Sequence, residues 1–427
     1  MKVALVHDYI KEYGGAERVL EALHEIWPDA PIFTSVYLPE FLGPHKERFK
    51  DWNIKTSFLQ YLPLKAKLIS PFRLIAPFVF KQFDFSQFDV VIVSATGAYS
   101  PNGIKIKNQK SKIKSTTQNS KLSQRPTTKD QRPIHICYCH TPPRYLYGYA
   151  TAREWKNNLF FRVLGEIANH FLRLVDFKSS QNVDFFIANS KNVAGRIKKF
   201  YRKESTVIYP PVEIDDRRLK IEGSNLKVES RKSIHPLTSS VKDQSSTFYH
   251  LPSKKTYFLA GGRIARAKHI DLIVETFAKL KLPLKVFGRE FGGNGLTHNS
   301  QLLTHNPNIQ FVGEVSDEEK LELMRNAKAF VFAAEDEDFG ITPVEAMSVG
   351  TPVISYKSGG VVESVVDGKT GLFYHFNDIY HLSEAIRKFE KTKFDRELII
   401  KHAQKFSKER FKKEIKLFVE KVYKKNL

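Results

Sequence analysis

The residues from Glu335 to Val353 have the types and the order expected of a ligand site. Their sequence, EDEDFGITPVEAMSVGTPV, places four acids and a Phe-Gly pair before a stretch that predicts a short helix. Proline is favoured in the first turn of a helix, and glycine followed by proline is typical of a helix end. The free amides at such a helix start favour a phosphate group. Glu337 and Glu345 flank this helix start, and we expect both side chains to face one crevice. The alternative is that the acids only complement the helix dipole, which would account for one acid but not for a run of four.

A glycine pair with two nearby cations forms the second candidate. Gly261, Gly262 and Arg263 follow an apolar run, and Lys268 comes just before a helical pattern. Glycines let the backbone approach a ligand closely, and a guanidinium and an ammonium both bind phosphate oxygens. Two surface cations beside a turn are the alternative. The segment has neither the Walker pattern nor the dinucleotide pattern G-x-G-x-x-G.

Two further segments follow predicted strands of the first half. Gly14 and Gly15 come after the first strand, and His140 ends another strand in the sequence CHTPPRY. A histidine at the end of a strand is usually structural, but this one lies on the edge where open α/β sheets bind ligands. Cys137 and Cys139 share one face of the strand. They have no second cysteine pair with which to bind zinc, so we predict that they belong to the core.

The elements that must position these residues alternate between strands and helices. Such alternation predicts two parallel sheets with right-handed crossovers, about five strands in each half. The expected strands are 3–7, 31–37, 89–95, 134–140 and 183–189, then 256–260, 284–287, 308–312, 329–333 and 352–356. Paired prolines after Tyr209 stop a strand, so we place the domain boundary there.

Length and composition limit the class of protein. The chain has 427 residues, which favours two or three domains, and its two cysteines exclude a disulfide scaffold. No window is apolar enough to predict a membrane span, and the N-terminus is not typical of a signal peptide, so we expect a cytoplasmic protein. The 68 basic and 46 acidic residues give a net charge of +22. That excess favours an anionic partner: a nucleic acid, a phosphorylated substrate or an anionic membrane face.

Taken together, these motifs resemble the retaining nucleotide-sugar glycosyltransferases of family 4, which have the GT-B fold. The resemblance covers both halves of the chain apart from two low-complexity segments. It depends on GGAERV at Gly14, HTP at His140, ANS at Ala188, YPPV at Tyr209, GGR…K at Gly261, GEVSDEE at Gly313, and E-x7-E at Glu337 and Glu345. The sequences HTPPRY and EDFGITPVEAM are most similar to the mannosyltransferase branch, which builds lipid-linked or cell-surface polysaccharides.

The resemblance implies a role for each candidate residue. Those expected to be catalytic are His140 beside the reaction centre, Arg263 and Lys268 on the donor diphosphate, and Glu337 near the transferred sugar. Those expected to bind the donor are Gly15, Val315 near the base, the backbone amides of Phe339, Gly340 and Ile341, and Glu345 on the ribose. No metal and no cofactor are implied, because the nucleotide sugar is a co-substrate.

The implied architecture has two doubly wound Rossmann-like domains that face a central cleft. The expected parts are an acceptor-side domain at 1–212 with a disordered insert at about 104–133, a low-complexity linker at 213–254, a nucleotide-sugar domain at 255–395, and helices at 396–427 that pack back on the first domain. The basic and apolar stretch from Lys55 to Lys81 matches the region where relatives touch membranes. It implies peripheral attachment to the inner face of an anionic membrane.

The most favoured function is transfer of mannose from GDP-mannose to a saccharide or polyprenyl-linked acceptor. A UDP-sugar-dependent transferase of the same family is the first alternative. A sugar-phosphate binding or epimerising enzyme would share the phosphate site. A basic membrane- or nucleic-acid-binding protein is the alternative from another class, but no aromatic-basic RNA motif is present, so no nucleic acid is expected.

Overall fold

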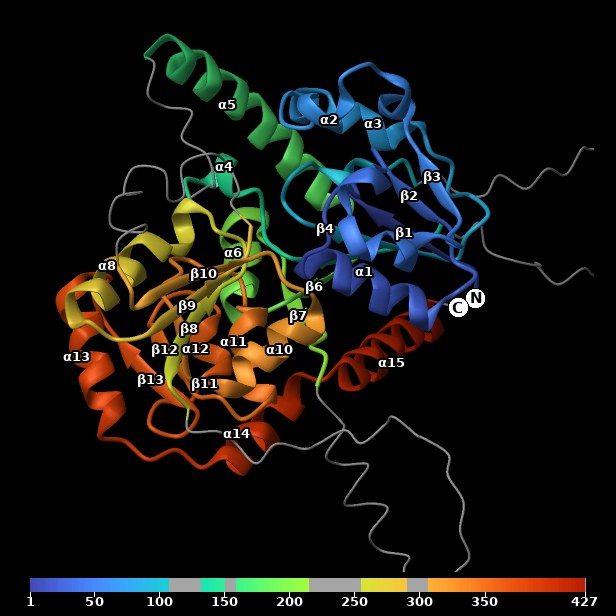
Figure 1. Ribbon diagram of the computed structural model, residues 1–427. Coiled ribbons are helices and arrows are strands. Elements are labelled where there is room, and N and C mark those ends of the chain that lie inside the picture. The colour runs from blue at the N-terminus through green and yellow to red at the C-terminus, as the bar shows by residue number, and fades with distance from the viewer. Residues whose placement is uncertain (107–131, 150–158, 215–254, 290–305, 427) are drawn as a thin grey trace, which may run out of the picture.

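The computed structural model describes residues 1–106, 132–149, 159–214, 255–289 and 306–426 (Figure 1). Most of the predicted insert at about 104–133 and of the linker at 213–254 lies outside these residues. The rest forms two α/β domains, one rich in blue and green and the other in yellow and orange.

The first domain is built on a fully parallel sheet in which, within the described ranges, seven strands pair in the order β3-β2-β1-β4-β5-β6-β7. The strands are β1 (Val3–His7), β2 (Ile32–Thr34), β3 (Ile54–Thr56), β4 (Val90–Ala95), β5 (Ile134–Cys139), β6 (Phe185–Ala188) and β7 (Ser205–Val207). Successive residues of β1 and β4 alternate between two apolar clusters, one on each face of the sheet. Helices therefore cover both faces, as a parallel sheet requires.

The second domain repeats this plan with six parallel strands among its described residues, in the order β10-β9-β8-β11-β12-β13. They are β8 (Tyr257–Gly261), β9 (Leu284–Phe287), β10 (Ile309–Gly313), β11 (Ala327–Phe332), β12 (Val353–Tyr356) and β13 (Gly371–Tyr374). The two-sheet GT-B architecture predicted from the sequence is confirmed. The expected number of about five strands in each half was too low, because β3, β7 and β13 are only three or four residues long.

The helices pack on the sheets in two layers for each domain. In the first domain they are α1 (Gly15–Ile26), α2 (Lys65–Leu68), α3 (Ala76–Val79), α4 (Arg144–Tyr147), α5 (Leu159–Gln181) and α6 (Lys191–Tyr201). In the second they are α8 (Ile270–Leu280), α10 (Asp317–Asn326), α11 (Ile341–Ser348), α12 (Val361–Ser364), α13 (Ile379–Glu390) and α14 (Arg396–Ala403). The last helix is α15 (Lys408–Asn426).

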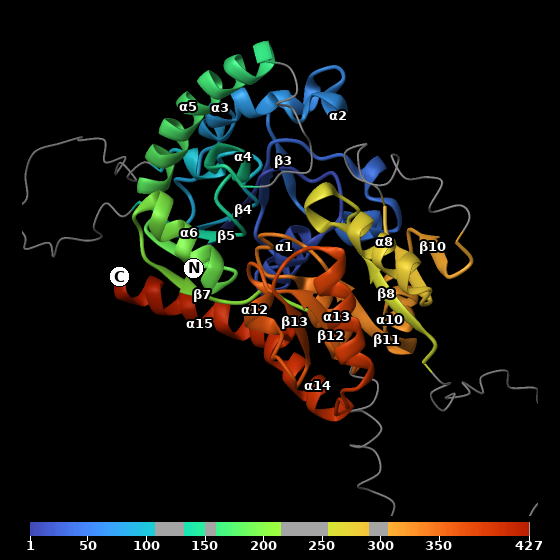
Figure 2. The same ribbon diagram turned by 90° about the vertical axis from the view of Figure 1, so that its left-hand side faces the viewer.

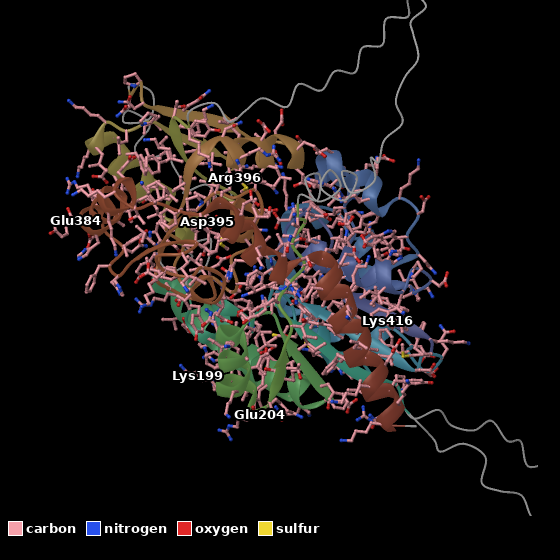
Figure 3. The ribbon with its side chains drawn as sticks, turned by 90° about the horizontal axis from the view of Figure 1, so that it is seen from below. Lys199, Glu204, Glu384, Asp395, Arg396 and Lys416 are labelled. Carbon is pink, nitrogen blue, oxygen red and sulfur yellow. The ribbon has the colours of Figure 1, made fainter. Side chains whose placement is uncertain are left out.

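The chain crosses between the domains at two adjacent points. Val212 and Ser407 form a parallel bridge, and the Val212 N–H donates to the Phe406 carbonyl at 3.0 Å. Beyond this crossing α15 returns to the first domain, where Phe411 and Ile415 are buried in one of its apolar clusters while Lys416 is exposed (Figure 3). The crossing ties the C-terminal helix to the domain in which the chain begins.

The segment from 396 to 427 does not pack back as one unit. In α14, Asp395 caps the first turn and Arg396 donates to the Val349 carbonyl at 3.1 Å, at the end of α11 (Figure 3). Ile399 of α14 is buried in a core cluster of the second domain. Of these two helices α15 returns to the first domain, whereas α14 stays on the second, where Ile399 and Ala403 are buried.

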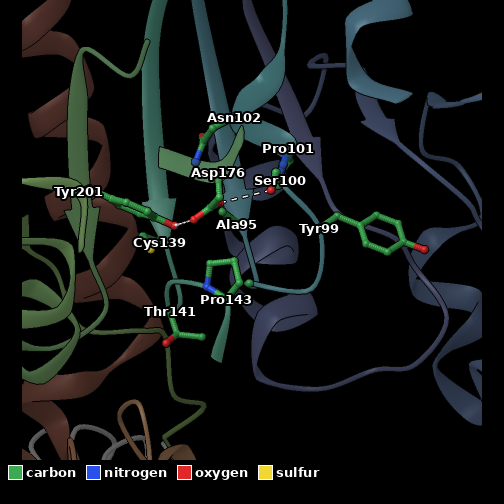
Figure 4. Close-up of a pocket in the computed structure, with 11 residues that line it drawn as sticks. Ala95, Tyr99, Ser100, Pro101, Asn102, Cys139, Thr141, Pro143, Asp176 and Tyr201 are labelled. Atoms are coloured by element: carbon green, nitrogen blue, oxygen red, sulfur yellow. Dashed lines mark hydrogen bonds between the residues drawn. The ribbon is translucent and has the colours of Figure 1, made fainter. Parts of the chain in front are cut away.

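Asp176 anchors the long helix α5 to the body of the first domain. Its carboxylate accepts hydrogen bonds from the hydroxyls of Ser100 at 3.2 Å and Tyr201 at 2.9 Å (Figure 4). The hydroxyl of Tyr147 donates a third hydrogen bond to it, at 2.9 Å. The side chains adjoin a cavity of about 10 Å³, which is room for one water. Burial raises the pKa of Asp176 to about 6, even though these three donors lower it.

We predict that Asp176→Asn changes how stability depends on pH. Between the unfolded pKa of 3.8 and the folded pKa of about 6, the native state binds the proton more tightly than the unfolded state. Wild-type stability relative to the variant should therefore rise by about 2 kcal/mol between pH 7 and pH 4.5. Urea unfolding of both proteins at the two pH values measures it. The exposed Asp51→Asn is the control, and an equal pH response in wild type and Asp176→Asn would contradict the assignment.

Candidate functional site

The two glycine loops follow the strands at which each sheet changes direction. In the first sheet the order reverses between β1 and β4, and in the second between β8 and β11. Ligands of open α/β sheets bind at such points, beyond the carboxyl ends of the strands. Gly261 has a φ of 154°, and an added Cβ would lie 2.3 Å from the Phe287 carbonyl oxygen, so this turn requires glycine.

These loops meet across the boundary between the domains. A Cβ added to Gly15 would lie 2.8 Å from Cδ1 of Ile341, and one added to Gly14 would lie 3.4 Å from Nη2 of Arg263. Arg263 also pairs with Glu12 of the first domain, at 3.1 Å between Nη2 and Oε1. The structure thus brings Gly15, Ile341 and Arg263 together, although each was singled out separately in the sequence.

Lys268 and Glu337 form an ion pair at the same edge of the second sheet. Lys268 Nζ lies 2.5 Å from Oε2 of Glu337, and both side chains are partly exposed. Burial alone would raise the pKa of Glu337, but the charges of Lys268 and Arg144 hold it below its usual range. A lysine ammonium has three donors, so one salt bridge leaves Lys268 able to contact an anion as well.

Glu345 lies at the centre of a network that joins the two domains. Its Oε1 accepts from Arg18 of α1 at 2.8 Å and from Lys320 of α10 at 2.8 Å. Asp317 accepts from the same two cations, at 2.7 and 2.9 Å. Burial alone would raise the pKa of Glu345, which is only 4% exposed, but Lys320 and Arg18 lower it. The carboxylate therefore stays ionised where it meets the first domain.

The four acids before α11 have different partners. Asp338 pairs with Arg196 at 2.7 Å and with Arg144 at 2.9 Å, both from the first domain. Both arginines also donate to the Asp336 carbonyl, at 3.0 and 2.8 Å. The acidic run from 335 to 338 as a whole, and not only Glu337, was a candidate for sugar contact because of its place before the helix start. That is too broad, because Asp338 holds the two domains together and Glu337 is the acid that faces Lys268.

The donor-binding residues predicted around the start of α11 and before α10 have different structural roles. Phe339 is 2% exposed and packs against Tyr209 and Phe406, so a bound molecule could reach only its backbone. Gly340 caps α11 with a φ of 87°, in the left-handed region that favours glycine. Val315 precedes Ser316, which caps α10 in a capping box with Glu319. The helix start predicted from the proline and glycine positions is thus present.

His140 follows β5 and is almost fully buried. The ring Nε2 of His140 lies 2.9 Å from the hydroxyl of Ser94 on β4. The backbone N–H of His140 donates to the Ala95 carbonyl at 2.9 Å. Burial and the nearby His7 lower the pKa of His140 to about 3, so the ring is uncharged at neutral pH. The next residue, Thr141, accepts from Arg196 at 3.0 Å. Because Arg196 also holds Asp338, the loop after His140 is bound to the acidic segment that contains Glu337.

The sequence analysis missed several charged residues at this site. Arg18 and Arg144 lie inside the quoted motifs GGAERV and HTPPRY, so the motifs themselves contained the signal. Arg196, which is 3% exposed, and Lys320 lie on helical stretches where a cation is ordinary. Their partners come from the other domain or from another helix, so only the tertiary structure identifies them.

Two features bear on which other ligands the site could take. Across the described ranges, no three His, Cys, Asp or Glu side chains gather as metal ligands would. The cavity beside Asp176 has room for a water but not for a sugar, so it is a packing feature of the first domain. The candidate site is the place where the two glycine loops and the start of α11 meet across the domain boundary.

Comparison with known proteins agrees with this geometry. Residues 241–409 match the family model of glycosyl transferases group 1. The capsular polysaccharide biosynthesis glycosyltransferase CapM of Staphylococcus aureus is 29% identical over 160 residues, which are 36% of this chain and 42% of that protein. The alpha-1,3/1,6-mannosyltransferase ALG2 of Rhizomucor pusillus is 25% identical over 271 residues, 53% of this chain and 54% of its own. The chain thus spans about half the length of the curated relatives it matches.

Solved structures match the fold over the whole chain. Anabaena HepE in complex with UDP superposes with a TM-score of 0.62 at 16% identity, covering 99% of this chain and all of that one. Sucrose-phosphate synthase from Thermosynechococcus elongatus has a TM-score of 0.65, also at 16% identity, covering 99% of both chains. These matches agree with the predicted resemblance to glycosyltransferase family 4: the second domain matches the family model of glycosyl transferases group 1, and the chain has the GT-B fold.

Proposed function

We propose that this chain is a retaining, metal-independent hexosyltransferase that moves mannose from GDP-mannose to a saccharide or polyprenyl-linked acceptor. The observation that carries the proposal is the meeting of the two glycine loops, with Arg263, Lys268 and Glu337 on one side and Gly15 on the other. The match to glycosyl transferases group 1 supports the reaction class, and the mannosyltransferase relatives favour the sugar. A UDP-sugar is the alternative donor, because HepE binds UDP.

In the proposed mechanism the protein stabilises the charge of the leaving diphosphate. Arg263, Lys268 and the amides at the start of α11 contact the phosphates, and Glu345 binds the ribose hydroxyls. The acceptor hydroxyl attacks the sugar from the face that the nucleotide leaves, so that the configuration is retained. Preorganised cations of this kind are usually the largest catalytic contribution.

Ribose binding by Glu345 predicts that Glu345→Gln weakens binding of the nucleotide while the protein still folds. Replacing a carboxylate in charged hydrogen bonds costs about 1.5–3 kcal/mol, or roughly 10–150-fold in Kd. Calorimetric titration with GDP and with UDP measures the effect. Asp317→Asn is the matched control, because it removes a charge from the same Arg18 and Lys320 network without removing the predicted ribose ligand. Equal weakening in both variants, or unchanged affinity in Glu345→Gln, would rule out the ribose contact.

The proposed leaving-group role of Lys268 predicts transfer without a divalent metal. Radiolabelled GDP-mannose, UDP-glucose, dTDP-glucose and ADP-glucose are each offered with an acceptor extract in excess chelator. We expect transfer from GDP-mannose at an undiminished rate, and a fall of about 10²–10³-fold in kcat for Lys268→Met. Lys279→Met, on the exposed face of α8, should leave the rate unchanged. Activity that disappears in chelator and returns with manganese would refute metal independence, and transfer from a UDP-sugar instead would identify the alternative donor.

We also propose that the first domain attaches to the inner face of an anionic membrane. From Lys55 to Lys81 the structure buries Phe72 and partly buries Leu68, but exposes Phe58, Leu62, Leu64, Ile75 and Phe78. Arg73 lies against the ring of Tyr145, at 4.8 Å, so it packs partly on the domain. The exposed cations are Lys55, Lys67 and Lys81.

Helix α5 extends this apolar surface. Its exposed side chains Val163, Ile167, Phe171 and Leu174 recur at helical spacing, on the opposite side from the buried Leu172. An amphipathic helix normally turns such a stripe toward the core. Helices α5, α2 and α3 lie at the same end of the first domain (Figures 1 and 2). An exposed apolar surface rimmed by lysines is typical of a membrane contact. In the described residues no helix has both the length and the hydropathy of a membrane span.

Vesicle sedimentation tests this attachment. Lys67→Glu with Lys81→Glu should weaken binding to anionic vesicles by about 10–100-fold at low salt, since each exposed cation contributes about 1 kcal/mol. Phe171→Ser with Leu174→Ser should also weaken it, by removing apolar contact. The control is Lys413→Glu with Lys416→Glu on α15, which changes the same charge at the other end of the molecule. Equal binding to neutral and anionic vesicles, or none to either, would contradict the proposal.

A further inference from the structure

A chain of buried polar groups runs beneath His140 and crosses three neighbouring strands. Ser94 of β4 lies between two rings: its hydroxyl is 3.1 Å from Nδ1 of His7 on β1 and 2.9 Å from Nε2 of His140 beyond β5. His7 and Ser94 are direct neighbours in the sheet register. On the far side of His7, its Nε2 lies 3.6 Å from Oε1 of Glu17 on α1.

This chain is shielded from solvent. His7 and Ser94 are fully buried, Glu17 is 6% exposed and His140 is 9% exposed. Leaving a polar group unpaired in such an environment costs about 1–3 kcal/mol. Within the described residues His7 Nε2 has no hydrogen-bond partner and only the carboxylate of Glu17 nearby. The interior of a parallel sheet is ordinarily apolar, so a polar chain at one end of it needs a reason other than packing.

The hydrogen-bonding capacities of these groups allow two directions for the chain, and the Glu17 carboxylate favours one of them. The Ser94 hydroxyl has one proton between two ring nitrogens, so it donates to one and accepts from the other. Glu17 accepts a hydrogen bond from the Gly14 backbone N–H at 2.9 Å through Oε2. Its other oxygen lies 3.6 Å from His7 Nε2, too far for a hydrogen bond, but the nearby carboxylate favours a proton on that nitrogen electrostatically. His7 Nδ1 then accepts from Ser94, and Ser94 accepts from a proton on Nε2 of His140.

We propose that Glu17, His7 and Ser94 are positioning residues that hold His140 as the Nε2–H tautomer, with Nδ1 as a hydrogen-bond acceptor. The inference deepens the proposed function and rests on it: the uncharged ring presents a lone pair to a hydroxyl of the transferred sugar. Such an acceptor binds a hydroxyl and is repelled by a phosphate oxygen. It therefore helps to keep the sugar, rather than the diphosphate, beside His140.

Nuclear magnetic resonance of the ¹⁵N-histidine-labelled protein tests the tautomer without any turnover. The chain has 14 histidines, so the His140 signals are assigned by their loss in His140→Gln. We expect the wild-type protein to show the proton on Nε2, and Ser94→Ala to lose this single tautomer. Ser355→Ala, which removes a buried hydroxyl from β12 of the other domain, is the matched control. A proton on Nδ1 in the wild type, or an unchanged His140 in Ser94→Ala, would overturn the inference.

Kinetics give the second measurement. Ser94→Ala should lower kcat by about 10–100-fold through misplacement of the ring, with little change in nucleotide affinity. Ser94→Thr keeps the hydroxyl and should restore both the tautomer and the rate. If Ser94→Ala lowers both nucleotide affinity and kcat while the His140 tautomer stays unchanged, the role of Ser94 is merely structural. The resonance measurement does not depend on turnover. If no nucleotide sugar proves to be a donor, the proposed function is wrong, but the tautomer of His140 can still be measured, so the two proposals fail separately.

Discussion

The buried carboxylate of Glu345 constrains how the two domains approach each other. A carboxylate that is 4% exposed has lost its water and needs cationic partners to remain charged. Lys320 provides one from the same domain, but Arg18 comes from α1 of the other. Since the two cations also share Asp317, the four charges satisfy one another only when α1 lies against α10 and α11. The buried carboxylate is best compensated when both cations are in place, so the network favours the arrangement in which the two domains meet.

A second cluster of charged residues also joins the two domains, around Asp338. Asp338 binds Arg144 and Arg196, and Ser190 donates to its carbonyl at 2.6 Å. These contacts place the loop after His140 against the segment that contains Glu337. The two clusters together fix the relative position of the glycine loops between them. The proposed site thus lies close to ion pairs that hold the two domains together.

The first domain has a buried, hydrogen-bonded end at the domain boundary and an exposed apolar surface elsewhere. The sheet end that carries His7, Ser94 and His140 is buried and internally hydrogen-bonded. At the far end of α5, Val163 and Ile167 face solvent, while Asp176 near its other end is anchored by two tyrosines. One helix therefore links the tightly packed interior to the surface that we propose meets a lipid face.

The amino-acid sequence by itself determined the α/β class, the two-domain division and the local geometry of the ligand loops. Strand and helix patterns depend on neighbouring residues, and so does the start of α11, where Gly340 and Pro343 specify the turn. The motif residues Gly15, His140, Arg263 and Lys268 could be selected for the same reason. Short strands such as β7 have too few residues to show a period, and the apolar stripe of α5 has the same spacing whether it faces a core or solvent. Only the tertiary structure decided which acid pairs with which cation, because Arg18 and Glu345 are 327 residues apart and neither carries a local sign of the other.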